Sequence, residues 1–262
     1  MISVLLFNSE TWLRLTKESI KRLESVDLML LRKVLKTPIS TPKVSLYLET
    51  GCVPLRYILK GKRIMFLHHI LTRDINSLIS RVFWAQVYDT GKGDWCQVVR
   101  QDLDMLGLEN LSFSDIKSTS KESLKALIND RINITALEEL LSEKSKLSKV
   151  SELTYTKLEM QQYLLDENLS TRQKQLLFRW RTKMTKVGWN YGKKDMLCPI
   201  CSDAEDTQDH LLECSALSSD SLFNQCVDME YDLNLHITRL EAVVRKREII
   251  LHEREKLKNV KT

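Results

Sequence analysis

The sequence predicts a mainly α-helical fold of one or more helical bundles, with a small Cys-Cys-His-Cys motif toward the C-terminal end. The chain of 262 residues contains only seven glycines and four prolines, which is few for a β-rich fold with many tight turns. Leu, Lys, Glu, Ile and Ser are abundant, and several segments repeat apolar residues at helical spacing. Three cysteines and one histidine gather within one short stretch, residues 198–214. These observations together favour a helical fold that is held together near its C-terminal end by this compact motif of cysteines and histidine.

The first 110 residues are predicted to form a helical bundle. The apolar run Met1–Phe7 predicts a strand or a buried lead-in segment. Helices are expected over the following ranges: Thr16–Leu35, Lys43–Glu49, Pro54–Arg73, Asp74–Val87 and Asp94–Leu106. Pro38 and Pro42 end the first of them, because proline removes a backbone donor and biases its predecessor toward extended geometry. Gly51 closes the second helix, Pro54 is expected at the first helical position of the third, and the Gly91-Lys92-Gly93 turn separates the last two.

Residues 111–167 are predicted to form a helical connector of two or three amphipathic helices, with caps at Ser114, Ser120 and Ser151. Ser170-x-x-Gln173 then reads as a capping box that opens a basic helix. One apolar stripe of that helix is formed by Leu176, Leu177, Trp180, Met184 and Val187. In residues 218–262, Thr238 is expected to cap a last helix. Its apolar side is formed by Leu240, Val243, Val244, Ile250 and Leu251, and its remaining positions are charged, so a frayed tail or a short coiled-coil seam is expected at its end.

Charge is strongly segregated along the chain, although the formal net charge is only +5. Residues 168–194 contain no Asp or Glu, whereas residues 195–235 contain ten acids and no Lys or Arg. The basic block predicts a nucleic-acid-binding surface, because cations neutralise phosphates and aromatic rings stack on unpaired bases. The expected contact residues are Arg172, Lys174, Arg179, Arg181, Lys183, Lys186, Trp189, Tyr191, Lys193 and Lys194. The alternative is that this block is an ordinary solvated face.

Cys198, Cys201, His210 and Cys214 follow the spacing Cys-x2-Cys-x8-His-x3-Cys, which is typical of a zinc knuckle. One Zn²⁺ bound by four such ligands has no open position, so the expected role of the ion is structural. The alternative is a set of unrelated cysteines. Acids around the motif would repel phosphate, so the knuckle is expected to anchor the fold rather than to grip nucleic acid.

No catalytic motif is evident, and no catalytic residue is predicted. The sequence contains no Gly-rich phosphate loop, no Gly-x-Ser-x-Gly elbow, no His-Glu-x-x-His pair and no Asp-Asp pair. No apolar run reaches the length of a membrane span, so no membrane partner is expected. Lone cysteines beside a thiolate motif indicate a reducing, intracellular compartment, either nucleus or cytoplasm.

Several stretches, taken together, resemble the C-terminal region of non-LTR (LINE-like) retrotransposon reverse transcriptases. The resemblance covers residues 2–217 approximately and is carried by Phe7-Asn8-Ser9-Glu10-Thr11-Trp12, Leu30-Leu31-Arg32-Lys33-Val34-Leu35, Ser40-Thr41-Pro42-Lys43, Leu46-Tyr47-Leu48-Glu49-Thr50-Gly51, Gln161-Gln162-Tyr163-Leu164-Leu165, Cys198-Pro-Ile-Cys201 and Thr207-Gln208-Asp209-His210-Leu211-Leu212-Glu213-Cys214. It implies a thumb-like bundle at residues 1–110, a connector at 111–167, a basic helix with the CCHC knuckle at 168–217 and C-terminal helices at 218–262.

The resemblance also implies that the catalytic aspartates of the polymerase palm would lie before Met1. The chain is therefore expected not to be an enzyme on its own. It is expected to be a retrotransposon remnant, a truncated gene product or a co-opted tail of such a polymerase. The leading hypothesis is a non-catalytic nucleic-acid-binding module, with RNA favoured over DNA and a polymerase or another protein as a further partner. The competing hypothesis is a protein interaction module that uses the acidic zinc face and the last helix. A third is a fragment without a selected function.

Overall fold

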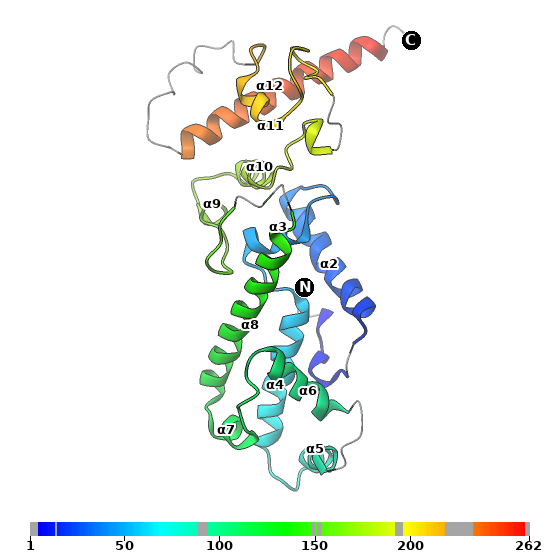
Figure 1. The fold of residues 1–262 in the computed structure, drawn as a ribbon, viewed down its shortest axis with the longest axis vertical. Helices are drawn as coiled ribbons and strands as arrows, with labels where there is room; N and C mark the ends of the chain where they lie inside the picture. The colour runs from blue at the N-terminus through cyan, green and yellow to red at the C-terminus, as the bar shows by residue number, and fades with distance from the viewer. Residues whose placement is uncertain are drawn as a thin grey trace. The chain divides into compact units, whose positions relative to one another are not determined.

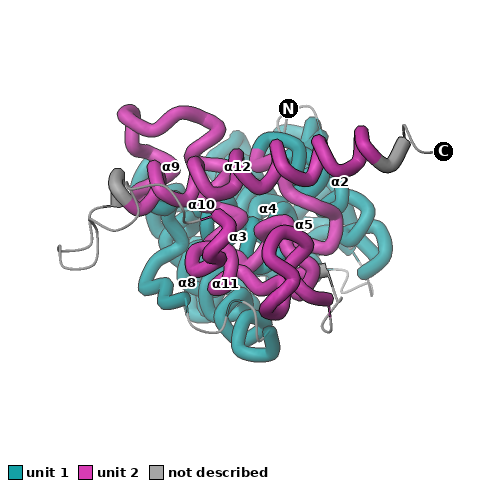
Figure 2. The backbone as a smooth tube through the Cα atoms, turned by 90° about the horizontal axis from the view of Figure 1, so that it is seen from above, with its two compact units in different colours: residues 1–34, 42–161 teal, residues 35–41, 162–262 magenta. Residues whose placement is uncertain are grey.

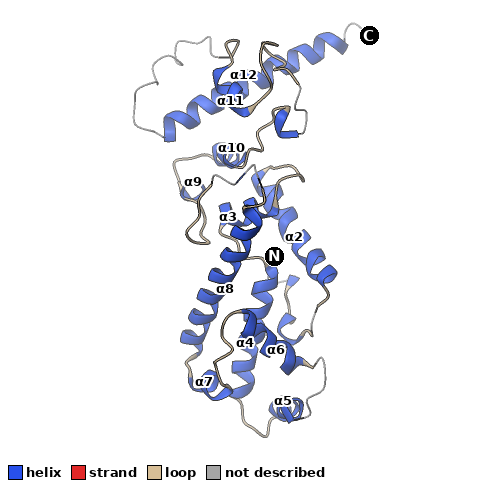
Figure 3. Ribbon diagram, in the orientation of Figure 1, coloured by secondary structure: helices blue, strands red, loops and turns tan. Residues whose placement is uncertain are grey.

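The computed structural model describes residues 5–13, 15–88, 94–147, 150, 153–191, 196–217 and 233–259. Over these residues the fold is mainly helical and contains no strand, so the predicted fold class is confirmed (Figure 3). Two isolated antiparallel bridges are present in this part of the chain, Thr50 with Met160 and Leu197 with Glu205. The chain divides into two compact units, residues 1–34 with 42–161 and residues 35–41 with 162–262 (Figure 2).

The first unit is organised around the helix α4. Its helical elements are η1 Ser9–Thr11, α2 Lys17–Leu35, α3 Lys43–Thr50, α4 Leu55–Leu71, α5 Leu78–Tyr88, α6 Trp95–Met105, α7 Phe113–Ser118 and α8 Lys121–Lys144 (Figure 1). The helix α4 contacts η1, α5, α6, α7 and α8, and α8 also packs on α3. The long helix α8 lies within the range predicted as a connector, yet it packs inside this unit. The predicted boundary at residue 110 therefore falls within the unit.

Close packing of α4 on α8 depends on Gly61. A Cβ atom at this position would lie 2.7 Å from the Ile132 side chain and 3.3 Å from that of Ile128. Both isoleucines are buried, as are Ile64 and Leu67 of α4. The missing side chain at position 61 therefore lets the two helices approach and bury these large apolar groups, which is the main stabilising contribution in such a core.

The buried side of α2 differs from the one its apolar spacing predicts. Met29 and Val34, two of the apolar residues that recur near helical spacing in this segment, are 59% and 67% exposed. Glu24 and Asp27 are buried instead. Arg56 of α4 explains the position of Glu24, because its guanidinium lies 2.5 Å from the carboxylate. An ion pair with another helix thus determines which face of α2 is buried, and helical periodicity alone does not reveal it.

The helices α2, α3, α4 and α6 begin within one residue of the predicted position, and three predicted details differ. Pro54 is the N-cap of α4 and not its first helical residue. The helix α5 begins at Leu78 and not at Asp74, because residues 74–77 form a turn closed by a bond from the Ser77 amide to the Asp74 carbonyl. Leu6, in the apolar N-terminal run, is buried, whereas Phe7 is exposed.

The third difference is the cap of α7, which is Ser112 and not Ser114. The Ser112 hydroxyl accepts a bond from the Asp115 amide, and the Asp115 carboxylate accepts one from the Ser112 amide. Ser120 caps α8 as predicted. Met1–Val4, the Gly91-Lys92-Gly93 turn and the predicted cap Ser151 lie outside the described residues.

The second unit contains α9 Gln162–Leu165, α10 Thr171–Arg181, η3 Trp189–Tyr191, α11 Gln208–Glu213 and α12 Leu233–Asn259. The predicted capping box of α10 is present at Ser170 and Gln173. However, α10 ends at Arg181, because Thr182 is its C-cap and Lys183 has a left-handed backbone with φ of 52°. Met184 and Val187, expected on the helix, reach the core from the irregular segment that follows.

The core of the second unit is an apolar cluster around the Cys-Cys-His-Cys motif. Its buried members are Val187, Cys198, Ile200, Leu211, Cys214, Leu217 and Val243. Trp180, expected in the core, packs against this cluster and is partly buried. The helix α12 begins before the predicted cap Thr238 and packs Val243, Val244, Ile250 and Leu251 on the cluster, so this apolar side is used within the unit. Over the described part of the chain, no helix is both long enough and apolar enough to cross a membrane.

The structure predicts different costs for alanine at two glycines that both have positive φ. Gly51 has φ of 65°, and a Cβ atom there would lie 2.3 Å from the Met160 amide nitrogen. Gly107 has φ of 64°, and nothing lies within 4 Å of its Cβ position. Gly107→Ala should therefore cost about 1 kcal/mol of unfolding free energy from backbone strain alone. Gly51→Ala should cost at least about 3 kcal/mol, because backbone atoms must move as well.

Urea unfolding of both variants and the parent measures this difference. Gly107→Ala is the matched control, since it carries the same backbone strain without the contact. Equal losses of stability in the two variants would contradict the close approach of residues 159–160 to Gly51.

Candidate metal centre

Backbone hydrogen bonds position the first two thiols. Cys198 lies in a short segment that pairs with residues 204–206 across the Leu197–Glu205 bridge. The Cys198 amide donates to the Ala204 carbonyl at 2.7 Å. Between them the chain reverses in a tight turn, in which the Ser202 amide donates to the Cys198 carbonyl at 2.9 Å and Ser202 has φ of 63°. This turn holds Cys201 close to Cys198.

The other two side chains are placed by the short helix α11. Thr207 caps this helix, and its hydroxyl accepts a bond from the His210 amide at 3.1 Å. His210 lies in the helix and Cys214 is its C-cap, so the two are four residues apart and project to one side. Leu211, between them, is buried in the apolar cluster and fixes the helix on the core.

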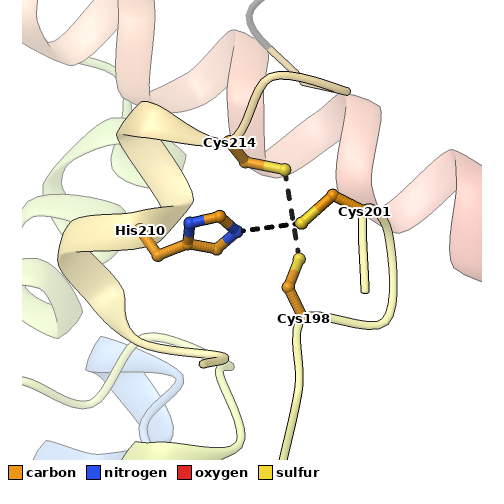
Figure 4. Close-up of side chains that lie close together, drawn as sticks. All are labelled: Cys198, Cys201, His210 and Cys214. Atoms are coloured by element: carbon orange, nitrogen blue, oxygen red, sulfur yellow. Dashed lines mark hydrogen bonds between the residues drawn. The ribbon is translucent and has the colours of Figure 1, made fainter. Parts of the chain in front are cut away.

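The four side chains converge as the sequence predicts (Figure 4). One nitrogen or sulfur atom from each lies within 4.8 Å of the corresponding atom of every other. The Cys201 Sγ is 3.3 Å from the His210 Nε2, and the Cys198 Sγ is 4.0 Å from the Cys214 Sγ. This group could hold one metal ion.

The four side chains differ in burial and in electrostatic environment. Cys198 and Cys214 are buried, whereas Cys201 and His210 are partly exposed. The Asp203 amide hydrogen bond lowers the pKa of the Cys201 thiol to about 7, together with smaller effects that include the bond to His210. Burial raises the pKa of Cys214 to about 11, and the charge of Cys198 adds to this shift. A metal ion that binds all four must therefore replace the proton of at least one buried thiol.

Two of the predicted nucleic-acid residues on α10 have partners within the second unit. Arg172 lies 3.9 Å from Glu241 and 3.8 Å from Glu248, both on α12. The Arg181 guanidinium lies over the Tyr163 ring, 5.5 Å from its centroid. Lys174 is partly exposed. Acids from a helix about 70 residues further along the chain thus neutralise part of the basic block, which an inspection of residues 168–194 alone cannot show.

Two of the predicted cations meet at one cavity. Arg179 and Lys186 line a space of about 320 Å³ that is also bounded by Glu248 and Glu255 of α12. Lys183 is partly exposed in the segment after α10, and the nearby Trp189 is 40% exposed. Tyr191 ends the η3 turn. Lys193 and Lys194 lie outside the described residues.

The sequence analysis missed the residues of α12 that fasten this helix to the motif. Arg247 is buried and lies 2.8 Å from the Asp206 carboxylate, which also accepts a bond from the Gly188 amide at 2.6 Å. Arg254 donates to the carbonyls of Pro199 and Ile200, inside the Cys198–Cys201 turn. Asp206 is therefore buried, unlike the exposed acids around the motif. One feature of the sequence does indicate the role of Arg247. This arginine interrupts the apolar stripe of α12, and a charged residue at such a position predicts a buried ion pair.

Compared with known proteins, the chain matches no family model, no curated protein and no solved structure. The interpretation of the centre therefore rests on its own geometry.

Breaking the buried pair between Arg247 and Asp206 should destabilise the second unit. Arg247→Met removes the guanidinium and leaves the buried carboxylate with the Gly188 amide. The expected loss is about 3 kcal/mol of unfolding free energy, because an uncompensated buried charge is costly. The exposed neighbour Arg245 provides the control, and Arg245→Met should cost less than about 0.5 kcal/mol. Chemical denaturation checks both values, and similar small losses would refute a structural role for the pair.

Proposed function

We propose that Cys198, Cys201, His210 and Cys214 bind one structural zinc ion. A tetrahedral site with usual zinc bond lengths places two sulfurs about 3.8 Å apart and a sulfur and a nitrogen about 3.6 Å apart. The corresponding distances of 4.0 and 3.3 Å lie close to these values. Three thiolates and one imidazole are the donors that zinc prefers, and four protein ligands leave no position for a substrate. The bound ion would join the Cys198–Cys201 turn to α11.

We further propose that the second unit binds nucleic acid, with RNA as the favoured ligand. Two observations support this function: Arg179 and Lys186 converge on one cavity, which Glu248 and Glu255 also line, and Trp189, three residues after Lys186, is 40% exposed. Cations would neutralise phosphates and the indole would stack on an unpaired base. The resemblance to the C-terminal region of non-LTR reverse transcriptases points the same way. In this proposal the chain binds RNA beside a polymerase and has no catalytic role of its own.

A second candidate function is protein binding through the acidic side of the metal motif. Asp203, Glu205, Asp209 and Glu213 are all exposed there. Four acids on one small module would attract a basic partner and repel a phosphate backbone. The two functions can be distinguished by experiment, because removal of Arg179 and Lys186 should abolish RNA binding and leave binding of a basic protein intact.

Removing a metal ligand should lower both the zinc content and the stability. Native mass spectrometry of the parent, purified without added zinc, should show one zinc per chain. Cys201→Ser and His210→Ala should lose the ion and should unfold at a clearly lower denaturant concentration, because metal binding is coupled to folding. Cys52→Ser is the matched control, since this cysteine lies in the first unit and should keep one zinc per chain. A parent without zinc, or a Cys201→Ser variant that unfolds like the parent with and without chelator, would refute the site.

RNA binding should depend on the cations of the proposed surface. The double variant Arg179→Gln with Lys186→Gln should bind a single-stranded ribo-oligonucleotide more weakly. The slope of log affinity against log salt should become shallower by about 1.4, since each lost phosphate contact on a single strand removes about 0.7.

The control for this measurement removes two exposed charges of α12, in Arg245→Gln with Lys256→Gln. This variant has the same net charge as the first and should keep the parent slope. Fluorescence anisotropy at several salt concentrations supplies the data. Equal slopes for both variants would show that binding reflects net charge and not this surface.

A further inference from the structure

The first unit contains a cavity that is rich in positive charge. It has a volume of about 620 Å³ and is bounded by residues of α2, α3, α4, α6 and α8. These helices are labelled in Figure 1. Two carboxylates line it, those of Asp102 and Glu139. Six cationic side chains line it as well, those of Lys17, Lys21, Lys43, Arg56, Lys60 and Arg63. None of these six was predicted as a binding residue, because they are dispersed over three segments of the sequence.

Ion pairs of 3.0 Å or less compensate three of the six cations. Arg63 binds Asp102 through two bonds, of 2.5 and 3.0 Å. Arg56 lies 2.5 Å from Glu24 and 2.9 Å from Glu139. Lys43 lies 3.0 Å from Glu143. These pairs account for the carboxylates of the cavity and hold its walls in place.

Lys60 shares its carboxylate partner with Arg63. Its side chain is only 13% exposed, and its ammonium contacts the Met105 sulfur and lies 3.7 Å from the Asp102 Oδ1, which already accepts a bond from Arg63. Burial lowers the pKa of the Lys60 ammonium, Asp102 opposes this shift, and the charges of Arg63 and Arg56 reinforce it. A buried ammonium with a shared partner is unfavourable for the fold, so its presence needs another explanation.

Lys17 and Lys21 add two further cations at the same cavity. Both are exposed, and neither has an ion-pair partner in the described part of the chain. They lie four residues apart on α2, and like charges at this spacing on a helix repel each other. Three cations from two helices thus face one space without enough acids to balance them.

We propose that this cavity binds a compact oligophosphate, with Lys17, Lys21 and Lys60 as the cations that hold it. Phosphate oxygens carry several negative charges within a small volume, and charge-assisted hydrogen bonds to ammonium groups are strong. Gln101 and Thr135 also line the cavity and offer neutral hydrogen bonds. The volume lies in the range of small-molecule sites, about 300 to 1,000 Å³. Lys60 lies too deep for a nucleic-acid backbone that tracks along exposed cations, which favours a small ligand.

The probe is inorganic tripolyphosphate, and calorimetric titration of the full chain at constant ionic strength measures its affinity. The parent should bind one tripolyphosphate and melt at a higher temperature in its presence. Lys17→Ala with Lys21→Ala should weaken binding at least tenfold. The matched control is Lys121→Ala with Lys125→Ala, which removes two exposed lysines at the same spacing on α8, outside this cavity. The control should bind like the parent.

Lys60→Met separates a ligand-binding role from a structural one. Because Arg63 continues to hold Asp102, this variant should melt at the parent temperature or above it when no ligand is present. It should still lose at least tenfold in affinity for tripolyphosphate. A lower melting temperature of the ligand-free variant would assign Lys60 to the fold and overturn its role as a binding residue.

Three other results would overturn the proposal. They are a parent that does not bind tripolyphosphate, an equal loss of binding in the α8 control, and a loss of ribo-oligonucleotide binding in the Lys17 and Lys21 variant. The last result would assign these lysines to a nucleic-acid surface. Tripolyphosphate binding is independent of the proposed RNA function, so Arg179→Gln with Lys186→Gln should leave it unchanged.

Discussion

The burial of two thiols of the candidate metal centre in an apolar cluster constrains the packing of the second unit. Cys198 and Cys214 lie among Ile200, Leu211 and Val243, where an ionised group without a counter-charge is strongly unfavourable. A bound cation would remove that penalty by pairing with the thiolates. Because the same cluster includes a residue of α12, ligand convergence and the packing of the last helix depend on each other. The turn, α11 and α12 therefore form one cooperative structure.

In the first unit, charge and not apolar area alone selects the arrangement of the helices. The guanidinium of Arg56 joins α4 to Glu24 of α2 and to Glu139 of α8. The pair of Arg63 with Asp102 joins α4 to α6 in the same way. Such buried pairs often contribute little net stability, but a helix that lost its partner would leave a charge uncompensated. They therefore favour one register of these helices over alternatives that bury as much apolar surface.

Features that depend on local sequence were predictable, and features that depend on distant partners were not. The capping box at Ser170, the left-handed Gly51 and the convergence of the four Cys-Cys-His-Cys side chains all follow from short stretches of the sequence. The end of α10 at Arg181 is different, because Met184 and Val187 suit a helix and also suit the irregular segment that packs on the core. The role of Arg247 requires the position of Asp206, 41 residues earlier.

The same distinction decides where positive charge is available to a ligand. Counting residues along the chain favours the α10 region, which has no acid for 27 consecutive positions, 168–194. In three dimensions Glu241 and Glu248 partly neutralise it through Arg172. The cavity around Lys60 has an unremarkable sequence, yet its carboxylates are already committed to Arg56 and Arg63. The positive charge that a ligand can use is the charge left after ion pairing within the protein. Composition therefore identifies basic segments, whereas the fold is needed to identify basic sites.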